Sequence, residues 1–222
     1  MLIEKVQSEI IDVGHKLLRS GLVTGTWGNI SARVARDTLA ITPSGRNYLS
    51  LETQDIVLVD QNGKIKEGKL TPSSELPLHV AVYQARSDIG AIVHTHSVFA
   101  SACAVANKAI APIIEDLLQV VGGSVEVAHY ALPGTAELAH NAVKSLGNKN
   151  AVLLANHGVL GCGSTLSEAL LCCELVEKAA QIYIYAQMLG GAISLSEDDI
   201  SQMHAFYQQH YRQRQEEARR EE

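Results

Sequence analysis

The stretch Ala91-Ile92-Val93-His94-Thr95-His96 decides how the rest of the chain is organised. Its apolar run predicts a buried β-strand, and the run ends in two histidines with one residue between them. Alternate side chains of a strand point to the same face, so His94 and His96 can reach one metal ion together. The pair fits two ordinary histidines of a half-buried strand equally well when it is taken alone.

Two further residues have the right chemistry to join this pair. Thr71-Pro72-Ser73-Ser74-Glu75 predicts a helix start with Ser74 as its N-cap, and His157 follows an apolar strand predicted over 151–155. One glutamate and three histidines form a typical ligand set for Zn²⁺ or a similar divalent ion. A glutamate at a helix start also complements the helix dipole, so Glu75 alone is more simply explained as structural. The other histidines lack a place at a strand end and are expected on the surface or in the core: His15, His79, His129, His140, His204 and His210.

The composition describes a globular chain of 222 residues, enough for one well-buried domain or two small ones. A net charge of −6 argues against nucleic-acid binding. No apolar run approaches the roughly 18 residues that a membrane-spanning helix needs, and the N-terminal stretch lacks a signal peptide's apolar core. Four cysteines without a C-x-x-C pair predict reduced thiols in a cytoplasmic protein.

The pattern of elements favours one α/β or α+β domain over residues 1–222, without a repeat or a linker. Helices are expected over 3–20, from Ser74 onward, over 97–106, 136–146 and 165–189, and in a charged tail over 197–222. Strands are expected over 39–42, 56–60, 91–96, 110–114, 125–130 and 151–155. A hairpin at Asn62-Gly63 and a strand partner at Val159-Leu160-Gly161 complete the pattern.

Three short turns rich in small residues are candidates for anion binding. They lie near Gly28, at Pro43-Ser44-Gly45 and at Ser73-Ser74. Exposed backbone N–H groups and a helix N-terminus can together form a phosphate cradle. Each turn is also an ordinary connection, and spacing alone does not show that the three converge.

Five motifs, taken in order, resemble the class II aldolase/adducin-head family, and most closely its L-fuculose-phosphate aldolase branch. They are Gly25-Thr26-Trp27-Gly28-Asn29-Ile30-Ser31, Thr42-Pro43-Ser44-Gly45, Pro72-Ser73-Ser74-Glu75 with His79, His94-Thr95-His96 and Asn156-His157-Gly158. The resemblance covers about residues 3–195. It implies a single-domain α/β/α sandwich with a mainly antiparallel central sheet. It also implies a homotetramer with active sites at the subunit interfaces.

The resemblance further implies a metal site, a phosphate site and a reaction. Zn²⁺, or in its place Mn²⁺ or Co²⁺, is expected on Glu75, His94, His96 and His157. The substrate phosphate is expected on Gly28, Asn29, Ser44, Gly45, Ser73 and Ser74. The reaction is cleavage of a (deoxy)ketose 1-phosphate, such as L-fuculose 1-phosphate, to dihydroxyacetone phosphate and a short aldehyde. The ion acts as a Lewis acid, and Glu75 moves the carbon-bound proton.

A second acid must serve the oxygen on the aldehyde side. The fuculose enzyme uses a tyrosine of a neighbouring subunit, but alignment through Gly122-Gly123 puts Asp116 at that position. A C-terminal tyrosine, Tyr211 or Tyr207, is the alternative, although the tail does not align residue by residue. This departure leaves the aldehyde and the acid open. A Schiff-base mechanism is disfavoured because no lysine lies in or beside the motifs.

Other activities share the scaffold and stay open. Ribulose-phosphate 4-epimerases make and rejoin the same bond, and a sugar-phosphate dehydratase and a decarboxylase also use the fold. The adducin head is a non-catalytic module of the same family. Such a module would have no reason to keep Glu75 together with three histidines, so the sequence favours an enzyme. The sequence does not choose the sugar or the metal.

Overall fold

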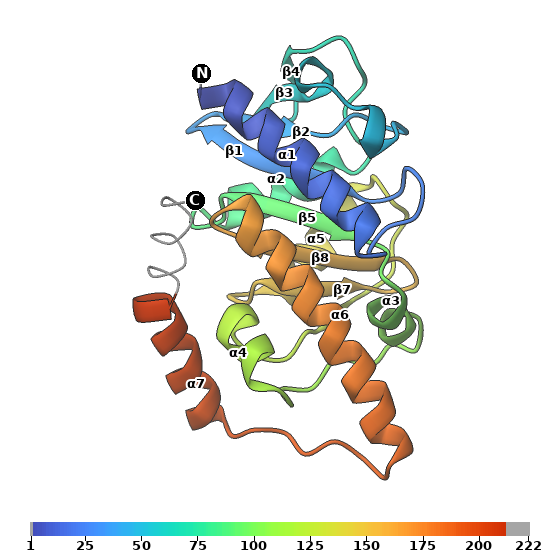
Figure 1. Cartoon of the computed structure of the whole chain (residues 1–222), viewed down its shortest axis with the longest axis vertical. Coiled ribbons are helices and arrows are strands. Elements are labelled where there is room, and N and C mark those ends of the chain that lie inside the picture. Colours follow the sequence, from blue (N-terminus) through green and yellow to red (C-terminus); the bar gives the residue numbers. More distant parts are fainter. Residues whose placement is uncertain (1, 212–222) are drawn as a thin grey trace.

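The computed structural model describes the backbone of residues 2–211 and the side chains of residues 3–210. It has three layers, with a sheet in the middle and helices on both faces (Figure 1). The strands are β1 (Asn29–Ala35), β2 (Thr38–Ile41), β3 (Val57–Asp60), β4 (Ile65–Glu67), β5 (Ala91–Thr95), β6 (Val127–Ala128), β7 (Ala151–Leu154) and β8 (Gly158–Gly163). The helices are α1 (Leu2–Arg19), α2 (Leu76–Ala85), α3 (Val98–Val105), α4 (Glu115–Val121), α5 (Ala136–Leu146), α6 (Leu166–Met188) and α7 (Glu197–Phe206).

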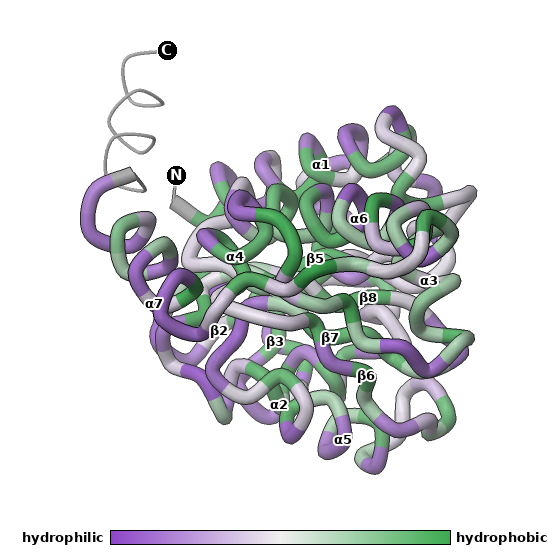
Figure 2. Tube along the Cα trace, turned by 90° about the horizontal axis from the view of Figure 1, so that it is seen from below, coloured by the Kyte–Doolittle hydropathy of each residue, from purple (hydrophilic) through white to green (hydrophobic). Residues whose placement is uncertain are grey.

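The sheet has the order β4-β3-β2-β1-β5-β8-β7-β6, and only β6 and β7 pair in parallel within the described residues. Helices α1, α3, α4 and α6 cover one face, and α2 and α5 cover the other (Figure 2). The expected α/β/α sandwich with a mainly antiparallel sheet is therefore confirmed. Within the described residues no helix is both long and apolar enough to cross a bilayer.

Strand β5 lies in the middle of the sheet and is buried on both faces. Ile92 packs in the core beneath α2 and α5, whereas Ala91 and Val93 pack in the core beneath α1 and α6. A strand covered on both sides needs apolar residues at successive positions, which explains its continuous apolar run. The run therefore places His94 in the interior, near the end of the central strand.

Strand β1 was not predicted, although it pairs with β5 beside the histidines. Its polar residues Asn29, Ser31 and Arg33 alternate with apolar ones, as in a strand with one exposed face. Here Asn29 and Ser31 are buried, because they face polar side chains of α2 instead of solvent. The glycines just before β1 made the segment look like a turn.

Two predicted strands are wrong over most of their length. Residues 110–114 make only an isolated bridge between Ile110 and Val125, and the strand expected over 125–130 is reduced to β6. Pro112 has no N–H to continue the pairing, and its carbonyl accepts a hydrogen bond from Leu195 instead. Helix α4, which follows, was not predicted. It is only seven residues long and ends at Gly122, whose φ is +86°.

We expect Leu160→Ala in β8 to lower the free energy of unfolding by about 2–5 kcal/mol, because it opens a cavity in the core. Leu160 is 0% exposed and packs in the core beneath α2 and α5. Leu132→Ala is the matched control, since that side chain is 64% exposed and should change stability by less than about 0.5 kcal/mol. Urea denaturation followed by circular dichroism measures both. Equal midpoints for the two variants would contradict this description of the core.

Candidate metal centre and phosphate pocket

Four residues from three parts of the chain meet at one end of the central strands. His94 is in β5 and His96 follows it, while His157 lies in the turn between β7 and β8. Glu75 stands immediately before α2. The strands approach closely here, because a Cβ on Gly158 would lie 2.3 Å from the carbonyl oxygen of Thr95. Glycine at the start of β8 therefore lets the turn with His157 come close to the histidines of β5.

The ligand atoms of these four residues form one cluster, and all lie within 4.8 Å of one another. His94 Nε2 is 2.9 Å from His96 Nε2 and 3.2 Å from His157 Nε2. Glu75 Oε2 is 3.1 Å from His94 Nε2, and Glu75 Oε1 is 3.3 Å from His157 Nε2. Ligands at about 2.0–2.2 Å from a tetrahedral ion lie about 3.4 Å apart, so these separations fit a divalent ion between them.

The hydrogen bonds around the cluster also fit a metal site. His94 donates its Nδ1–H to the carbonyl oxygen of Val159 at 2.9 Å, which leaves a lone pair on Nε2 for a metal. Among the described residues, buried Glu75 Oε1 has no hydrogen-bond donor. A buried carboxylate oxygen without a donor requires an explanation, and an ion at this place supplies one.

The protonation states suit a metal as well. Burial alone would raise the pKa of Glu75, but the neighbouring imidazoles, His94 first, lower it to about 2. Burial lowers the pKa of His94 to about 4, against the opposing effect of Glu75. Burial also lowers the pKa of His96. At neutral pH Glu75 is thus an anion, and the imidazoles of His94 and His96 are neutral. These are the forms in which carboxylates and histidines bind metals.

The start of α2 differs from the prediction. Glu75, not Ser74, is the N-cap residue, and its side chain makes no capping bond. The backbone of Glu75 has φ −95° and ψ 11°, in a sparsely populated region where active-site residues are often found. Ser73 Oγ accepts a hydrogen bond from the Glu75 N–H at 3.2 Å. The carboxylate is therefore not used to cap the helix and is turned toward the imidazoles.

The three small-residue turns line one pocket with the cluster. Ser44 N–H donates to Thr71 O, and Ser73 N–H donates to Thr42 O, which joins two of the turns side by side. The pocket has a volume of about 340 Å³. Its lining consists of Thr26, Trp27, Gly28, Asn29, Pro43, Ser44, Gly45, Ser73, Ser74, Glu75, His96, Pro133 and His157. All six predicted phosphate residues are thus brought together beside Glu75, while their role stays a prediction.

The turn before β1 reaches the cluster through Gly28. This residue has φ +86°, and a Cβ there would lie 2.7 Å from the carbonyl oxygen of His94. Any other residue would therefore push the turn away from β5. The neighbouring Trp27 is 66% exposed, with its ring centroid 5.8 Å from that of His96. Sequence reasoning assigned no role to Trp27 or Pro133, which both line the pocket.

The Asn29 side chain faces the cluster and not only the pocket. Asn29 lies opposite His94 across β1 and β5. Its Nδ2 donates to Glu75 Oε2 at 2.8 Å, and its Oδ1 lies 2.5 Å from His79 Nε2. A phosphate contact by Asn29 would therefore fall to its main chain. His79, expected as an ordinary surface or core residue, is 0% exposed and contacts the site through this amide.

Asp116 and Tyr207, two of the three predicted second acids, do not line this pocket of the described chain. The carboxylate of Asp116 in α4 pairs with Lys178 of α6 and is partly exposed. Its predicted role concerns a neighbouring subunit and stays a prediction. The side chain of Tyr211 lies outside the described residues, so its role stays a prediction too. The described part of the tail packs on α4, where His204 Nδ1 donates to Gln119 O.

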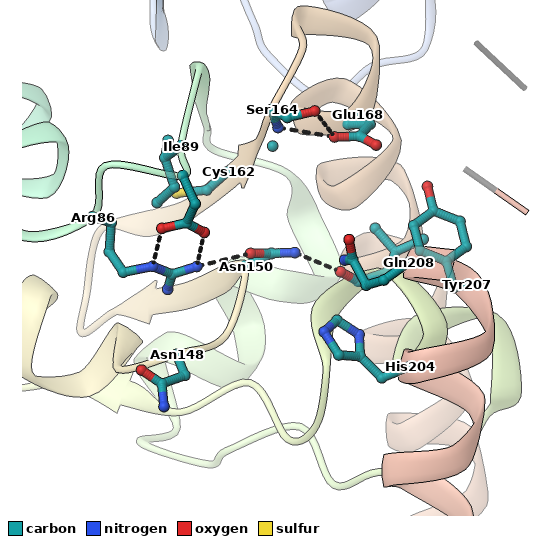
Figure 3. Close-up of a pocket in the computed structure, with 13 residues that line it drawn as sticks. Arg86, Ile89, Asn148, Asn150, Cys162, Ser164, Glu168, His204, Tyr207 and Gln208 are labelled. Atoms are coloured by element: carbon teal, nitrogen blue, oxygen red, sulfur yellow. Dashed lines mark hydrogen bonds and ion pairs between the residues drawn. The ribbon is translucent and has the colours of Figure 1, made fainter. Parts of the chain in front are cut away.

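Tyr207 lines a different pocket (Figure 3). That pocket includes Ser164 after the end of β8, whereas the metal cluster lies at the start of β8. Figure 1 shows the same separation, with α7 on the left and the end of β5 on the right. The guanidinium group of the second pocket, Arg86, is occupied by a two-bond pair with Asp88 at 2.7 and 2.8 Å, and the pocket also contains the carboxylates of Asp88 and Glu168. The second pocket is therefore a poorer anion site than the turns around Gly45.

Comparisons with known proteins agree with this geometry. Residues 8–184 match the family described as Class II Aldolase and Adducin N-terminal domain. The chain is 37% identical over 204 residues to 5-deoxy-D-ribulose 1-phosphate aldolase of Bacillus thuringiensis serovar kurstaki, which covers 91% of this chain and 95% of that protein. It is 39% identical over 196 residues to L-fuculose phosphate aldolase of Escherichia coli strain K12, covering 88% and 90%. A solved structure of L-fuculose 1-phosphate aldolase is similar with a TM-score of 0.89 and 38% identity, covering 92% of this chain and 96% of that one.

These matches span most of the chain, and they confirm the resemblance seen in the five motifs. They include the segments that carry Glu75, His94, His96 and His157. Class II aldolases depend on a metal ion, and the cluster could hold one. The chain belongs to the class II aldolase and adducin N-terminal domain family, and it is a lyase of that family.

Proposed function

We propose that this protein reversibly joins dihydroxyacetone phosphate to a short aldehyde, forming a (deoxy)ketose 1-phosphate, and cleaves the same sugar. The observation that carries the proposal is that one pocket is lined both by residues of the metal cluster and by the three small-residue turns. L-Fuculose 1-phosphate and 5-deoxyribulose 1-phosphate are the first sugars to consider, because the named relatives act on them. Both would place a phosphate at C1 and a carbonyl at C2.

Zn²⁺ is the proposed ion on Glu75, His94, His96 and His157, since imidazole and carboxylate ligands at tetrahedral spacing suit it. Mn²⁺ and Co²⁺ are the alternatives. When bound, the ion would supply Lewis-acid stabilisation of the negative charge that develops on the ketose oxygens. The chain's own contribution is to hold the phosphate, to orient the substrate and to move protons.

Glu75 is the proposed base in the direction of synthesis. Its carboxylate is ionised at neutral pH and lies beside the proposed metal position, so it can take a proton from C3 of dihydroxyacetone phosphate. The electron pair of that C–H bond then forms the bond from C3 to the aldehyde carbon. The aldehyde oxygen takes a proton from a second acid, for which Asp116 of a neighbouring subunit or Tyr211 is proposed. In cleavage the same bonds and protons move in reverse.

The function is tested by incubating the purified protein with single ketose 1-phosphates. L-Fuculose 1-phosphate, 5-deoxyribulose 1-phosphate and ribulose 1-phosphate should be tried with Zn²⁺, Mn²⁺ or Co²⁺ added. Release of dihydroxyacetone phosphate, read by coupling to NADH oxidation, is the expected result. If no dihydroxyacetone phosphate is released from any of them, the aldolase proposal is wrong, and epimerisation of ribulose 5-phosphate is the next assay.

The proposed position of the phosphate is tested by two substitutions of Gly45 that differ in charge but not in size. Its φ is +66°, which Asn and Asp tolerate better than other residues, and a Cβ there meets nothing within 4 Å. Gly45→Asp places a negative charge at the turn. For an assumed separation of about 8 Å between the two charges and an effective dielectric constant of about 20, repulsion costs about 2 kcal/mol. We expect KM to rise about 30-fold for Gly45→Asp relative to the neutral, equally bulky Gly45→Asn. Equal KM values for the two variants would place the phosphate elsewhere.

We further propose a homotetramer with active sites between subunits, located in the cytoplasm. Support comes from large apolar side chains left exposed on α3 and α6, among them Val98, Val105, Tyr185 and Met188. The cysteines of the described residues are all free, as expected for a reducing compartment. Light scattering should give about four times the chain mass of 23.9 kDa. A monomer at assay concentration would contradict the assembly.

A further inference from the structure

A row of polar side chains runs along the buried contact between α2 and β1. On the helix side they stand four residues apart, and on the strand side two residues apart. Four residues advance an α-helix by about 6 Å, and two residues advance a strand by about 6.6 Å, so the two rows stay in step. The row consists of Glu75, His79 and Tyr83 beside α2, and Asn29 and Ser31 on β1.

These five residues form a continuous chain of hydrogen bonds. Tyr83 Oη lies 2.9 Å from Ser31 Oγ, which lies 2.6 Å from His79 Nδ1. His79 Nε2 lies 2.5 Å from Asn29 Oδ1, and Asn29 Nδ2 donates to Glu75 Oε2 at 2.8 Å. All five residues are at most 6% exposed. This series of direct side-chain hydrogen bonds therefore links the metal cluster to the protein interior.

The ionised carboxylate dictates the direction of every bond in this chain. Glu75 can only accept, so Asn29 must turn its NH₂ group toward it and its oxygen toward His79. His79 Nε2 must then carry a hydrogen. The ring of the buried His79 bonds through its two nitrogens to a neutral amide and a neutral hydroxyl, and a buried ring with neutral partners stays neutral, so its Nδ1 accepts a bond from the Ser31 hydroxyl. Tyr83 in turn donates to Ser31.

This arrangement is more than the fold requires. Apolar side chains of similar shape would fill the same space, and replacing both partners of a buried hydrogen bond by apolar groups can be nearly neutral for stability. Ser31 and Tyr83 belong neither to the pocket lining nor to the cluster, yet the Ser31 hydroxyl supplies the partner that the Nε2–H tautomer of His79 needs at Nδ1. Tyr83 and Ser31 can therefore affect Glu75 only through His79 and Asn29.

We propose that His79 is a positioning residue that locks the Asn29 amide with its NH₂ group toward Glu75, and so holds the Glu75 carboxylate in one orientation. The inference rests on the proposed function of Glu75 as metal ligand and base. Without the His79 donor, the Asn29 amide can rotate and bring its oxygen against the carboxylate. Glu75 would then lose its donor and its fixed position relative to the imidazoles.

The expected effect is on turnover and on the metal, not on substrate phosphate binding. Loss of a residue that orients a metal ligand typically costs about 10- to 100-fold in activity or metal affinity. We therefore expect His79→Leu to lower kcat by about 10- to 100-fold, with KM changed by less than about threefold. His79→Gln keeps a donor toward Asn29 and should recover much of the loss. Ser31→Ala, which adds no bulk and releases the tautomer, should show a smaller loss in the same direction.

The experiment compares these three variants with wild type and with Val82→Ala. Val82 is 0% exposed on the same helix, and it has no polar group to join the chain, so this variant controls for lost packing. The first readout needs no substrate: the visible absorption spectrum of bound Co²⁺ and its dissociation constant report the geometry of the ligands. The second readout is exchange of the C3 proton of dihydroxyacetone phosphate with D₂O, followed by NMR. Melting of the metal-free proteins monitors folding.

The proposal predicts a changed Co²⁺ spectrum and slower proton exchange in His79→Leu and Ser31→Ala, with partial recovery in His79→Gln and neither change in Val82→Ala. It is overturned if folded His79→Leu or Ser31→Ala keeps the wild-type spectrum and exchange rate, or if Val82→Ala changes them equally. If His79→Leu does not fold, the other two variants still decide. Failure of the proposed function is distinguishable, because wild type would then show no exchange while the Co²⁺ spectra still differ.

Discussion

Replacing His94 by alanine is expected to remove the divalent ion and to slow sugar cleavage by at least about a thousandfold. Its Nε2 atom lies within 3.2 Å of a ligand atom of each of the other three residues, so no ligand is more central. A Lewis acid at the reacting oxygens supplies several kcal/mol of transition-state stabilisation, and about 1.4 kcal/mol corresponds to tenfold in rate. Elemental analysis of the purified variant and the coupled assay measure the two effects.

The control for this prediction is His140→Ala. That residue is exposed on α5 and lies outside the cluster, so metal content and rate should stay at the wild-type values. A His94→Ala protein that keeps one tightly bound ion per chain and full activity would mean that the cluster is not the catalytic metal centre.

Replacing Glu75 by glutamine is expected to lower kcat by about 100- to 10,000-fold, the range that general acid–base catalysis contributes. Glutamine keeps the size of the side chain and can still accept the bond from Asn29, but it cannot take a proton. The three histidines remain, so some of the metal should be retained at a high metal concentration. Exchange of the C3 proton of dihydroxyacetone phosphate with D₂O should nearly stop even in the metal-loaded variant.

Glu126→Gln is the matched control, because that carboxylate pairs with Lys149 outside the pocket. Its exchange rate should equal that of wild type. Wild-type exchange in metal-loaded Glu75→Gln would show that another group removes the proton, and Asp116 of a neighbouring subunit would then be the first residue to test.

Much of the metal cluster could be predicted because its ligands stand at element ends that the sequence marks clearly. The apolar run before His94 identifies a buried strand, and alternation puts His96 on the same side. His157 follows a second apolar run, and small residues precede Glu75. These patterns arise from burial and local backbone preference, which short stretches of sequence carry.

Other parts of the site depend on tertiary contacts that no single stretch reveals. Asn29 and Ser31 are buried polar residues of β1, and only the polar face of α2 makes their burial favourable. His79 therefore looked like an isolated core residue, although its spacing of four from Glu75 matches the spacing of two on β1. This matched spacing is the sequence pattern from which the polar contact between α2 and β1 could have been predicted. Helix α4 was missed, and the strand expected over 125–130 was predicted too long, because Pro112 and Gly122 interrupt the local pattern.

Trp27 gives the pocket a built-in optical reporter. It is the only tryptophan of the chain, and its indole ring stands at the pocket beside His96. Fluorescence excited at the indole band therefore comes from a single place, with no background from other indoles. Titrating the native protein with a quenching ion such as Co²⁺, or with a sugar phosphate, would convert occupancy of the pocket directly into an emission signal, without a label or a mutation.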